Sequence, residues 1–302
     1  MAEAPGDSAI HEATGRQKHA IGLDRGGGRL DAGPLAGVPS DMAWRHWEHL
    51  TTTDLAGAAC AGAVVVLPVA AVEQHGPHLP LGTDAILTDA VLDAALDRLP
   101  AAVDALRLPT QRIGLSPEHL SFPGTLSFDA ESVIAQWTSI GRSVARAGIG
   151  RLLLLNGHGG QAALVDLVAM RLRAEFGMTV ARATYFAFLD GAPGLDERER
   201  LFGWHGGLVE TALMLAVRPE LVRLEQARDF RSAAEGVAGG HAALRVEGET
   251  GIAWMAEDLN PSGATGNAAA ATPEIGRRLL DRAAARLAAL IAELHGFTGL
   301  AR

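Results

Sequence analysis

Two runs of consecutive apolar residues stand out along the chain, and each leads through a polar loop into a helical pattern. The first run is Val64–Val69, and the second consists of the four leucines that follow the arginine in Arg151–Leu155 (RLLLL). Apolar runs of this length without polar alternation are typical of strands that are buried on both faces of a parallel sheet. The segments after them repeat apolar residues close to every 3.6 positions, which predicts helices. Strands that alternate with helices predict an α/β fold with a mostly parallel sheet that helices cover on both faces.

The C-terminal helix has the clearest boundary signals among the other elements. Thr272 can cap its first turn, and Pro273 suits the first helical position because an N–H there would have no partner. Residues 227–270, by contrast, are rich in loop-forming residues. The pattern also predicts a short helix near 53–55, strands near 106–109 and 178–185, and helices over 85–99, 129–147, 161–176, 204–217 and 275–294.

The N-terminal region differs from the rest of the chain. Residues 1–40 are rich in Gly, Ala and Asp and show no hydrophobic periodicity, which predicts a mobile extension. Residues 41–299 are expected to form a single domain. With 48% apolar residues in the chain, this domain can bury a sizeable core.

Composition narrows the classes of partner. The formal net charge is −9 and no Lys- or Arg-rich run occurs, which argues against nucleic acid and against a membrane surface. No apolar run approaches the roughly 18–20 residues of a membrane span, and the N-terminus does not resemble a secretory signal. Cys60 is the single cysteine, which excludes an intrachain disulfide and a cysteine-based zinc site. Together these features predict a cytoplasmic protein.

The loop after the first apolar run concentrates side chains that bind metals or transfer protons. Glu73 and His75 lie two positions apart, so on an extended backbone they project to the same side. Asp84 closes the loop, and its alternative role is the N-cap of the helix that follows. Carboxylates combined with imidazole suit Zn²⁺ or Mn²⁺. We therefore predict that Glu73, His75 and Asp84 are metal ligands.

The loop after the second apolar run adds His158. In a parallel sheet both loops open at the same edge, so His158 can reach the first cluster. A competing interpretation is dinucleotide binding, because Gly157, Gly159 and Ala162 match the pattern G-x-G-x-x-G/A. That pattern also needs an acidic residue at the end of the next strand, whereas Glu175 falls within a predicted helix. A dinucleotide-binding oxidoreductase is therefore an alternative from a different class of enzyme.

Further polar residues are expected at the edge of this site. His205 and Glu210 flank the start of a predicted helix, and five positions on a regular helix separate side chains by about 140°. Both can face one site only if His205 lies in the turn before the helix, which Gly206–Gly207 would allow. Glu210 could otherwise be a first-turn residue that the helix dipole favours, and His205 a surface residue. Three loop residues are candidates for substrate contact or structural hydrogen bonds: His78, Glu118 and His119.

The chain resembles the creatininase (creatinine amidohydrolase) family from about residue 42 to residue 296. The matching segments are Glu73–Pro80 (EQHGPHLP) with Asp84, Glu118–His119 with Phe122–Thr125 (FPGT), Asn156–Gly160 (NGHGG), His205–Gly207 (HGG) with Glu210, and Asn260–Gly263 (NPSG). The resemblance implies a three-layer α/β/α fold, a site with two divalent metal ions, and a homo-oligomer, often a hexamer. It also implies a small-molecule amide as the substrate.

The resemblance further implies roles for individual residues. Glu73 and His158 would hold one metal ion, His75 the other, and Asp84 would bridge the two. In creatininase the second ion takes a glutamate two positions after the ligand histidine, and that position here is Gly160. We therefore predict that Glu210 replaces this glutamate as a ligand. The departure argues against creatinine itself as the substrate.

Related members of the family hydrolyse other amides, including a formamide in flavin and deazaflavin precursor synthesis and a peptide bond in mycofactocin maturation. We expect a metal-dependent amidohydrolase that cleaves a small amide, cyclic amides included, with water activated by two metal ions. Zn²⁺ is the first expectation, with Mn²⁺ or Fe²⁺ as alternatives. His205 is the nearby histidine without a metal, so it is predicted to be the general acid/base. A non-catalytic metal-binding or assembly protein on the same fold is the remaining alternative.

Overall fold

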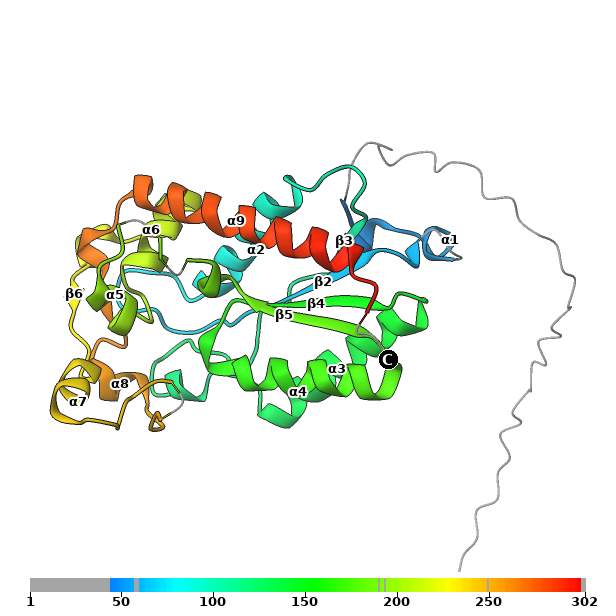
Figure 1. Cartoon of the computed structure of the whole chain (residues 1–302). Coiled ribbons are helices and arrows are strands. Elements are labelled where there is room, and N and C mark those ends of the chain that lie inside the picture. The colour runs from blue at the N-terminus through cyan, green and yellow to red at the C-terminus, as the bar shows by residue number, and fades with distance from the viewer. Residues whose placement is uncertain (1–43, 57–59, 190, 193, 249, 300–302) are drawn as a thin grey trace, which may run out of the picture. The chain divides into compact units, whose positions relative to one another are not determined.

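The computed structural model describes residues 44–56, 60–189, 191–192, 194–248 and 250–299 (Figure 1). All of them fall within one compact unit that spans residues 39–302. The predicted extension over residues 1–40 lies outside the described residues. Within the described part of the chain, no helix combines the length and the hydrophobicity that a membrane span needs.

A parallel sheet forms the centre of the described residues. Its five strands lie in the order β1 (Trp44–His46), β3 (Ala105–Arg107), β2 (Val64–Val69), β4 (Arg151–Asn156) and β5 (Thr179–Thr184). Every neighbouring pair is parallel. The two apolar runs of the sequence form the pair β2 and β4, in which Val69 lies opposite Asn156. Because the carboxyl ends of these strands are in register, the loops that follow them begin side by side, as predicted.

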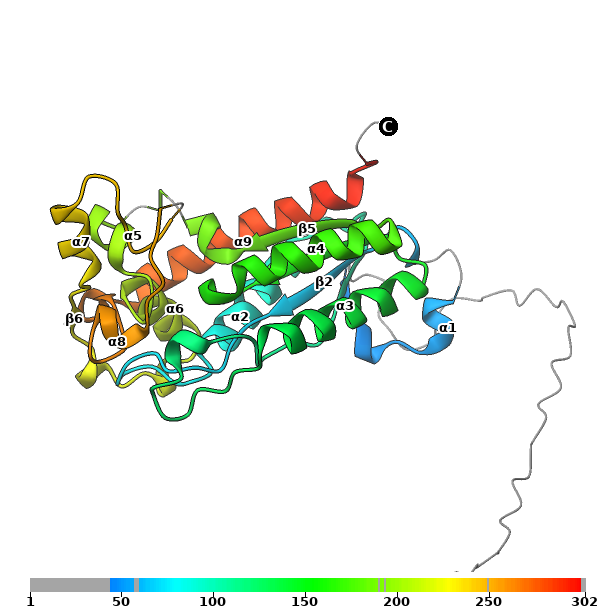
Figure 2. The ribbon, with the colours of Figure 1, turned by 90° about the horizontal axis from the view of Figure 1, so that it is seen from below.

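Helices cover both faces of the sheet, so the predicted three-layer α/β/α fold is confirmed (Figures 1 and 2). One layer consists of α2 (Thr83–Leu96), α6 (Leu208–Val217) and α9 (Pro273–Gly296), and the other of α3 (Ala130–Arg146) and α4 (Ala162–Phe176). Strand side chains alternate between the layers, because successive residues of a strand point to opposite faces. Val64 and Val66 pack under the first layer, whereas Val65 and Leu67 pack under the second. This double burial explains why the strands read as continuous apolar runs.

The observed first residues of the helices can be compared with the caps that the sequence predicts. The Asp129 carboxylate accepts a hydrogen bond of 2.7 Å from the amide three residues later, and Thr272 accepts one of 3.3 Å in the same way. Both predicted caps are therefore confirmed. Helix α2 begins earlier than predicted, with Gly82 at its N-cap position, so the alternative role of Asp84 as N-cap is wrong. Asp84 instead lies in the first turn, where the helix dipole favours a carboxylate.

Short elements gather at one end of the sheet, beside the start of α6 (Figure 1). The predicted helix over 204–217 begins only at Leu208, because Gly206 has a φ of +63°, a left-handed conformation that a helix does not continue through. The sequence did not reveal the short helices of this end. The short elements at this end are α5 (Glu197–Phe202), β6 (Asp229–Phe230), α7 (Ala234–Gly240), α8 (Ala256–Leu259) and β7 (Gly266–Asn267). The predicted short helix near 53–55 is α1 (Thr52–Leu55), which lies at the opposite end of the sheet (Figure 1).

The close contact of α9 with α6 yields a first prediction. A Cβ atom at Gly276 would overlap the carbonyl oxygen of Ala212, a backbone atom that cannot rotate away. Gly276→Ala should therefore lower the free energy of unfolding by about 1–3 kcal/mol, measured by urea denaturation, because the helices must separate. Where the new Cβ atom meets no neighbour, replacing Gly by Ala in a helix instead raises stability by up to about 1 kcal/mol.

Gly296→Ala is the matched control in the same helix, since nothing lies within 4 Å of its Cβ position. Equal effects of the two substitutions would contradict a limiting contact at Gly276.

Candidate functional site

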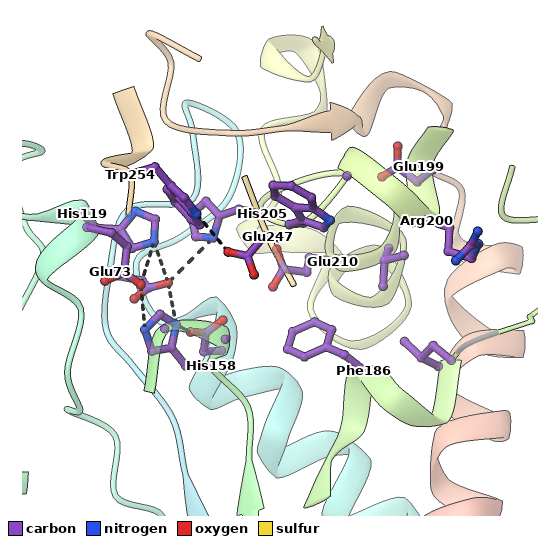
Figure 3. A pocket seen from close by; sticks show the side chains of 18 of the residues that line it. Glu73, His119, His158, Phe186, Glu199, Arg200, His205, Glu210, Glu247 and Trp254 are labelled. Carbon is purple, nitrogen blue, oxygen red and sulfur yellow. Dashed lines mark hydrogen bonds and ion pairs between the residues drawn. The ribbon is translucent and has the colours of Figure 1, made fainter. Parts of the chain in front are cut away.

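A cavity of about 540 Å³ opens where the loops after β2, β4 and β5 meet (Figure 3). One part of its wall carries carboxylates and imidazoles, and another part carries apolar side chains. Sheets of parallel strands place ligand sites at the carboxyl ends of their strands. The cavity has this location, so its polar part is the candidate site.

Asp84 lies between two imidazoles in the polar part. Its Oδ1 is 3.1 Å from Nε2 of His75, and its Oδ2 is 3.4 Å from Nδ1 of His158. The two histidines come from the loops after β2 and β4, so the predicted convergence of these loops is confirmed. Asp84 is buried, and its two oxygens face different imidazoles. One carboxylate therefore links two groups of side chains.

Glu73 belongs to the group around His158. Its Oε1 lies 3.2 Å from Nδ1 of His158, and the whole side chain is buried. The other ring nitrogen of His158, Nε2, donates a hydrogen bond of 3.0 Å to the carbonyl of Leu115. The amide of Asn156 donates to the carbonyl of His158 at 2.6 Å. When the ring is neutral, the bond from Nε2 keeps the proton on that nitrogen and directs the lone pair of Nδ1 toward Glu73 and Asp84.

Glu210 belongs to the group around His75. Nδ1 of His75 donates to the carbonyl of Glu73 at 3.1 Å, so in the neutral ring the lone pair of Nε2 is directed toward Asp84. Oε1 of Glu210 lies 3.7 Å from this Nε2, and its Oε2 accepts a hydrogen bond of 2.6 Å from the amide of Gly206. Glu210, which the sequence predicts as the replacement ligand, thus lies on the same side of the site as His75.

His205 lies in the turn before α6. According to the sequence analysis, this is the location from which His205 and Glu210 can face one site. Its Nε2 donates to the carbonyl of Gln74 at 2.6 Å, and its Nδ1 is 3.8 Å from Oε1 of Glu73. The ring packs against His75 and His119, with centroid distances of 4.1 and 4.3 Å. Burial, reinforced by His75, lowers the pKa of His205 to about 4. His205 is therefore a neutral imidazole whose unprotonated nitrogen faces the site.

Gln74 organises the surrounding imidazoles, although the sequence assigned it no role. Its amide nitrogen donates to the carbonyl of Gly263 at 2.9 Å and to Nδ1 of His119 at 2.8 Å, while its oxygen accepts from the amide of Gly76 at 2.9 Å. Because Nδ1 of His119 accepts, Nε2 carries the proton, and it lies 3.3 Å from Oε1 of Glu73. The N–H of His119 thus faces the Glu73 carboxylate without forming a hydrogen bond of regular geometry. The position of Gln74 within the first motif was the available sequence signal.

The other two predicted substrate contacts have different surroundings. Glu118 lines the cavity, with Oε1 3.3 Å from Nε2 of His158. It fills the space beside Gly160, where a Cβ atom would overlap the Glu118 carboxylate. His78 does not line this cavity, and its Nε2 instead pairs with the hydroxyl of Thr211 at 2.9 Å. This geometry supports a structural role for His78 rather than substrate contact.

The loop of the competing dinucleotide interpretation is closely packed. A Cβ atom at Gly157 would overlap the hydroxyl of Thr88 in α2. The glycine therefore allows the loop to approach a helix, and the next residue, His158, points at the carboxylates. This geometry gives no support to the binding of a phosphate group at the loop.

The electrostatics of the site reflect its crowded carboxylates. Burial raises the pKa of Glu73 above its ordinary value. Burial would lower the pKa of His75, but Asp84 and Glu210 outweigh it and raise this pKa well above its ordinary value. The pKa of His158 rises in the same way, because Glu73 and Asp84 outweigh its burial. The polar part of the cavity therefore attracts positive charge.

These residues fit divalent cations. Both carboxylate oxygens of Glu73 and Oδ2 of Asp84 are buried without a hydrogen bond of regular geometry to any described residue. Buried charged groups need ion or metal partners, and a set of carboxylates and imidazoles suits Zn²⁺ or Mn²⁺. Three sets of side chains each bring ligand atoms within 4.8 Å of one another: Glu73, His119 and His205; His75, His205 and Glu210; and Glu73, His75 and Asp84.

Glu199 is a buried carboxylate in the cavity wall that the sequence interpretation missed. Its Oε1 accepts a hydrogen bond of 2.6 Å from the amide of Leu208, and its Oε2 accepts one of 2.8 Å from the amide of Asn267. Glu199 therefore ties α5 to the start of α6 and to β7, and it supports the turn that holds His205. Glycines leave room for this carboxylate at positions 203, 207 and 266, where Cβ atoms would overlap it.

Comparison with known proteins agrees with this geometry. The family model described as "Creatininase: Creatinine amidohydrolase" matches residues 48–291. The chain belongs to the creatininase family. The creatininase-family relatives include the creatinine amidohydrolase of Pseudomonas putida, which is 32% identical over 207 residues, or 63% of this chain and 75% of the relative. The mycofactocin precursor peptide peptidase of Mycobacterium tuberculosis is 33% identical over 225 residues, or 71% of this chain and 79% of the relative.

Solved structures of creatininases share the fold. A crystal structure of creatinine amidohydrolase has a TM-score of 0.67 at 29% identity and covers 84% of this chain and 98% of its own. A mutant creatininase described as Zn–Zn type has a TM-score of 0.66 at 28% identity, covering 82% of this chain and 97% of its own. A creatininase described as the Mn form has a TM-score of 0.65 at 28% identity, with the same coverage. The resemblance that the sequence motifs indicated is thus confirmed.

The clamp formed by Glu199 leads to a prediction for this creatininase-family chain. Glu199→Ala removes both acceptors and leaves two backbone N–H groups, of Leu208 and Asn267, without their partner. The free energy of unfolding should fall by about 1–3 kcal/mol in urea denaturation, the penalty for unsatisfied buried donors.

Glu197→Ala is the control, because Glu197 lies in the same helix with its side chain 80% exposed. That variant should stay within about 0.5 kcal/mol of the parent protein. A Glu199→Ala protein as stable as the Glu197→Ala protein would show that the clamp contributes nothing.

Proposed function

We propose that this chain is a metal-dependent amidohydrolase that cleaves the C–N bond of a small amide. The observation that supports the proposal most is the position of Asp84, whose two oxygens face His75 and His158 at 3.1 and 3.4 Å. A carboxylate shared between two groups of nitrogen and oxygen ligands suits a pair of divalent cations. Zn²⁺ is the first candidate, with Mn²⁺ or Fe²⁺ as alternatives, and the related Zn–Zn and Mn creatininases support this choice.

Each proposed cation would have its own set of ligands. Glu73, His158 and Asp84 would hold one cation, and His75, Asp84 and Glu210 the other. Glu118 occupies the space beside Gly160 and lies near His158 rather than His75, so Glu210 is the carboxylate available for the second cation.

Side chains of this chain would transfer the proton and position the proposed ligands. When bound, two divalent cations lower the pKa of a water molecule and polarise an amide carbonyl. The free Nδ1 of His205 can accept a proton and return it to the leaving nitrogen, while the bond from Nε2 to the carbonyl of Gln74 holds the ring in place. Nε2 of His119 lies 3.3 Å from Oε1 of Glu73, close enough to help orient a proposed ligand.

The identity of the amide is the finer part of the proposal. The names of the relatives refer to creatinine and to a precursor peptide, so cyclic amides, formamides and short peptides form the test set. Metal analysis of the purified protein, followed by a hydrolysis screen of this set, tests the function. A protein that binds the metals and hydrolyses none of the set would instead be a non-catalytic metal-binding protein. The expected homo-oligomer, a hexamer by family resemblance, can be measured on the same sample.

Glu210→Gln tests the second set of ligands. The substitution removes the charge that faces His75, so the metal content should fall from two ions to one per chain, measured by elemental analysis. Glu220→Gln is the control, because Glu220 is exposed and pairs with Arg218, and it should keep both ions. Two ions at full occupancy in Glu210→Gln would rule out Glu210 as a ligand.

His205→Ala separates proton transfer from metal binding. The variant should keep its metal content and lose turnover by about 10²–10⁴-fold, because a general acid/base contributes that much to the rate. His241→Ala, at an exposed position, should change neither property. Loss of metal from His205→Ala would show instead that His205 is a ligand.

A further inference from the structure

We propose that the cavity selects amides that carry an apolar substituent of about the size of a phenyl ring. The substituent would pack on four side chains that we name the apolar wall: Phe186, Leu189, Leu195 and Val209. This inference rests on the proposed amide hydrolysis and specifies its substrate class.

The size of the cavity first indicates a substrate larger than a bare amide. Its volume is about 540 Å³. Cavities that bury most of the surface of a drug-sized ligand have volumes of roughly 300–1,000 Å³. The cavity therefore has room for a substituent beside the amide group.

The chemistry of the apolar wall then indicates what the substituent is. None of its four residues carries a polar side-chain atom, and the main core supports each of them from behind. Leu189 is itself part of the buried core, and the ring of Phe186 packs on that of Tyr185 at a centroid distance of 4.1 Å. A polar group placed against these side chains would lose hydration without gaining a partner.

The apolar wall adjoins the proposed reaction centre. Val209 precedes Glu210 in the first turn of α6, and both Phe186 and Glu210 line the cavity (Figure 3). A substrate with its amide carbonyl at the polar part can therefore place a substituent directly on this surface. Arg200 is the one Lys or Arg residue that lines the described cavity, and it lies near Glu197 at 3.9 Å. The lining thus offers an anionic substituent one cationic side chain that already lies near a glutamate, whereas the four residues of the apolar wall can pack on an apolar substituent.

Hydroxamic acids test this inference, because they chelate divalent metals and carry a variable substituent. Calorimetry on the metal-loaded full chain should show phenylacetohydroxamate binding at least tenfold more tightly than acetohydroxamate, since burying a phenyl group contributes that much. Val209→Thr, nearly isosteric but polar, should reduce this ratio at least threefold. Val222→Thr is the matched control, because Val222 is also partly buried against the core but does not line the cavity, and it should keep the parent ratio.

The outcomes separate the two levels of the proposal. If the parent protein binds both compounds with nearly equal affinity, the apolar wall does not select the substituent. The proposed metal site would still stand, because both compounds bind. Equal reductions of the affinity ratio by Val209→Thr and Val222→Thr would also contradict selection by the apolar wall. If the metal-loaded protein binds neither compound, the proposed metal site fails, and the inference fails with it.

Discussion

The structure depends on one buried carboxylate that faces two imidazoles. Asp84 is 2% exposed, yet its pKa lies below the ordinary value, because His75 and His158 outweigh the effect of burial. A buried carboxylate without partners would be strongly destabilising, so these neighbours must be held in place. Asp84 also lies in the first turn of α2, where the helix dipole favours a negative charge. The parallel pairing of β2 with β4 is what brings the two histidine loops to the same carboxylate.

Sequence reasoning succeeded where local pattern and strand geometry decide the outcome. The apolar runs identified β2 and β4, and parallel strands then required the loops with His75 and His158 to meet. The failures have physical causes. Asp84 looked like a helix cap because its residue type is common there, but Gly82 starts the helix. Glu199 gave no signal, since its partners lie up to 68 positions away.

The network around Gln74 shows a second limit of the sequence. Its amide connects to the carbonyl of Gly263, 189 positions further along the chain, and to His119, 45 positions along. These contacts decide which nitrogen of His119 carries a proton, and therefore that His119 faces Glu73 with its N–H. A motif can place a glutamine beside two ligand candidates, but only the folded chain shows which imidazoles it orients. The distinction between ligand and donor arises from such long-range hydrogen bonds.

The absence of a side chain at Gly160 changes how the site is supported. In the family pattern the second carboxylate comes from the loop after β4, which the sheet holds directly. Here Glu118 fills that space, and the carboxylate near His75 is Glu210, in the first turn of α6. The position of α6 depends on its contact with α9 at Gly276 and on the hydrogen bond from Leu208 to Glu199. Because Val209 of the apolar wall precedes Glu210, one helical turn carries a residue proposed to contact the substrate and a proposed ligand, so a shift of α6 would move the two together.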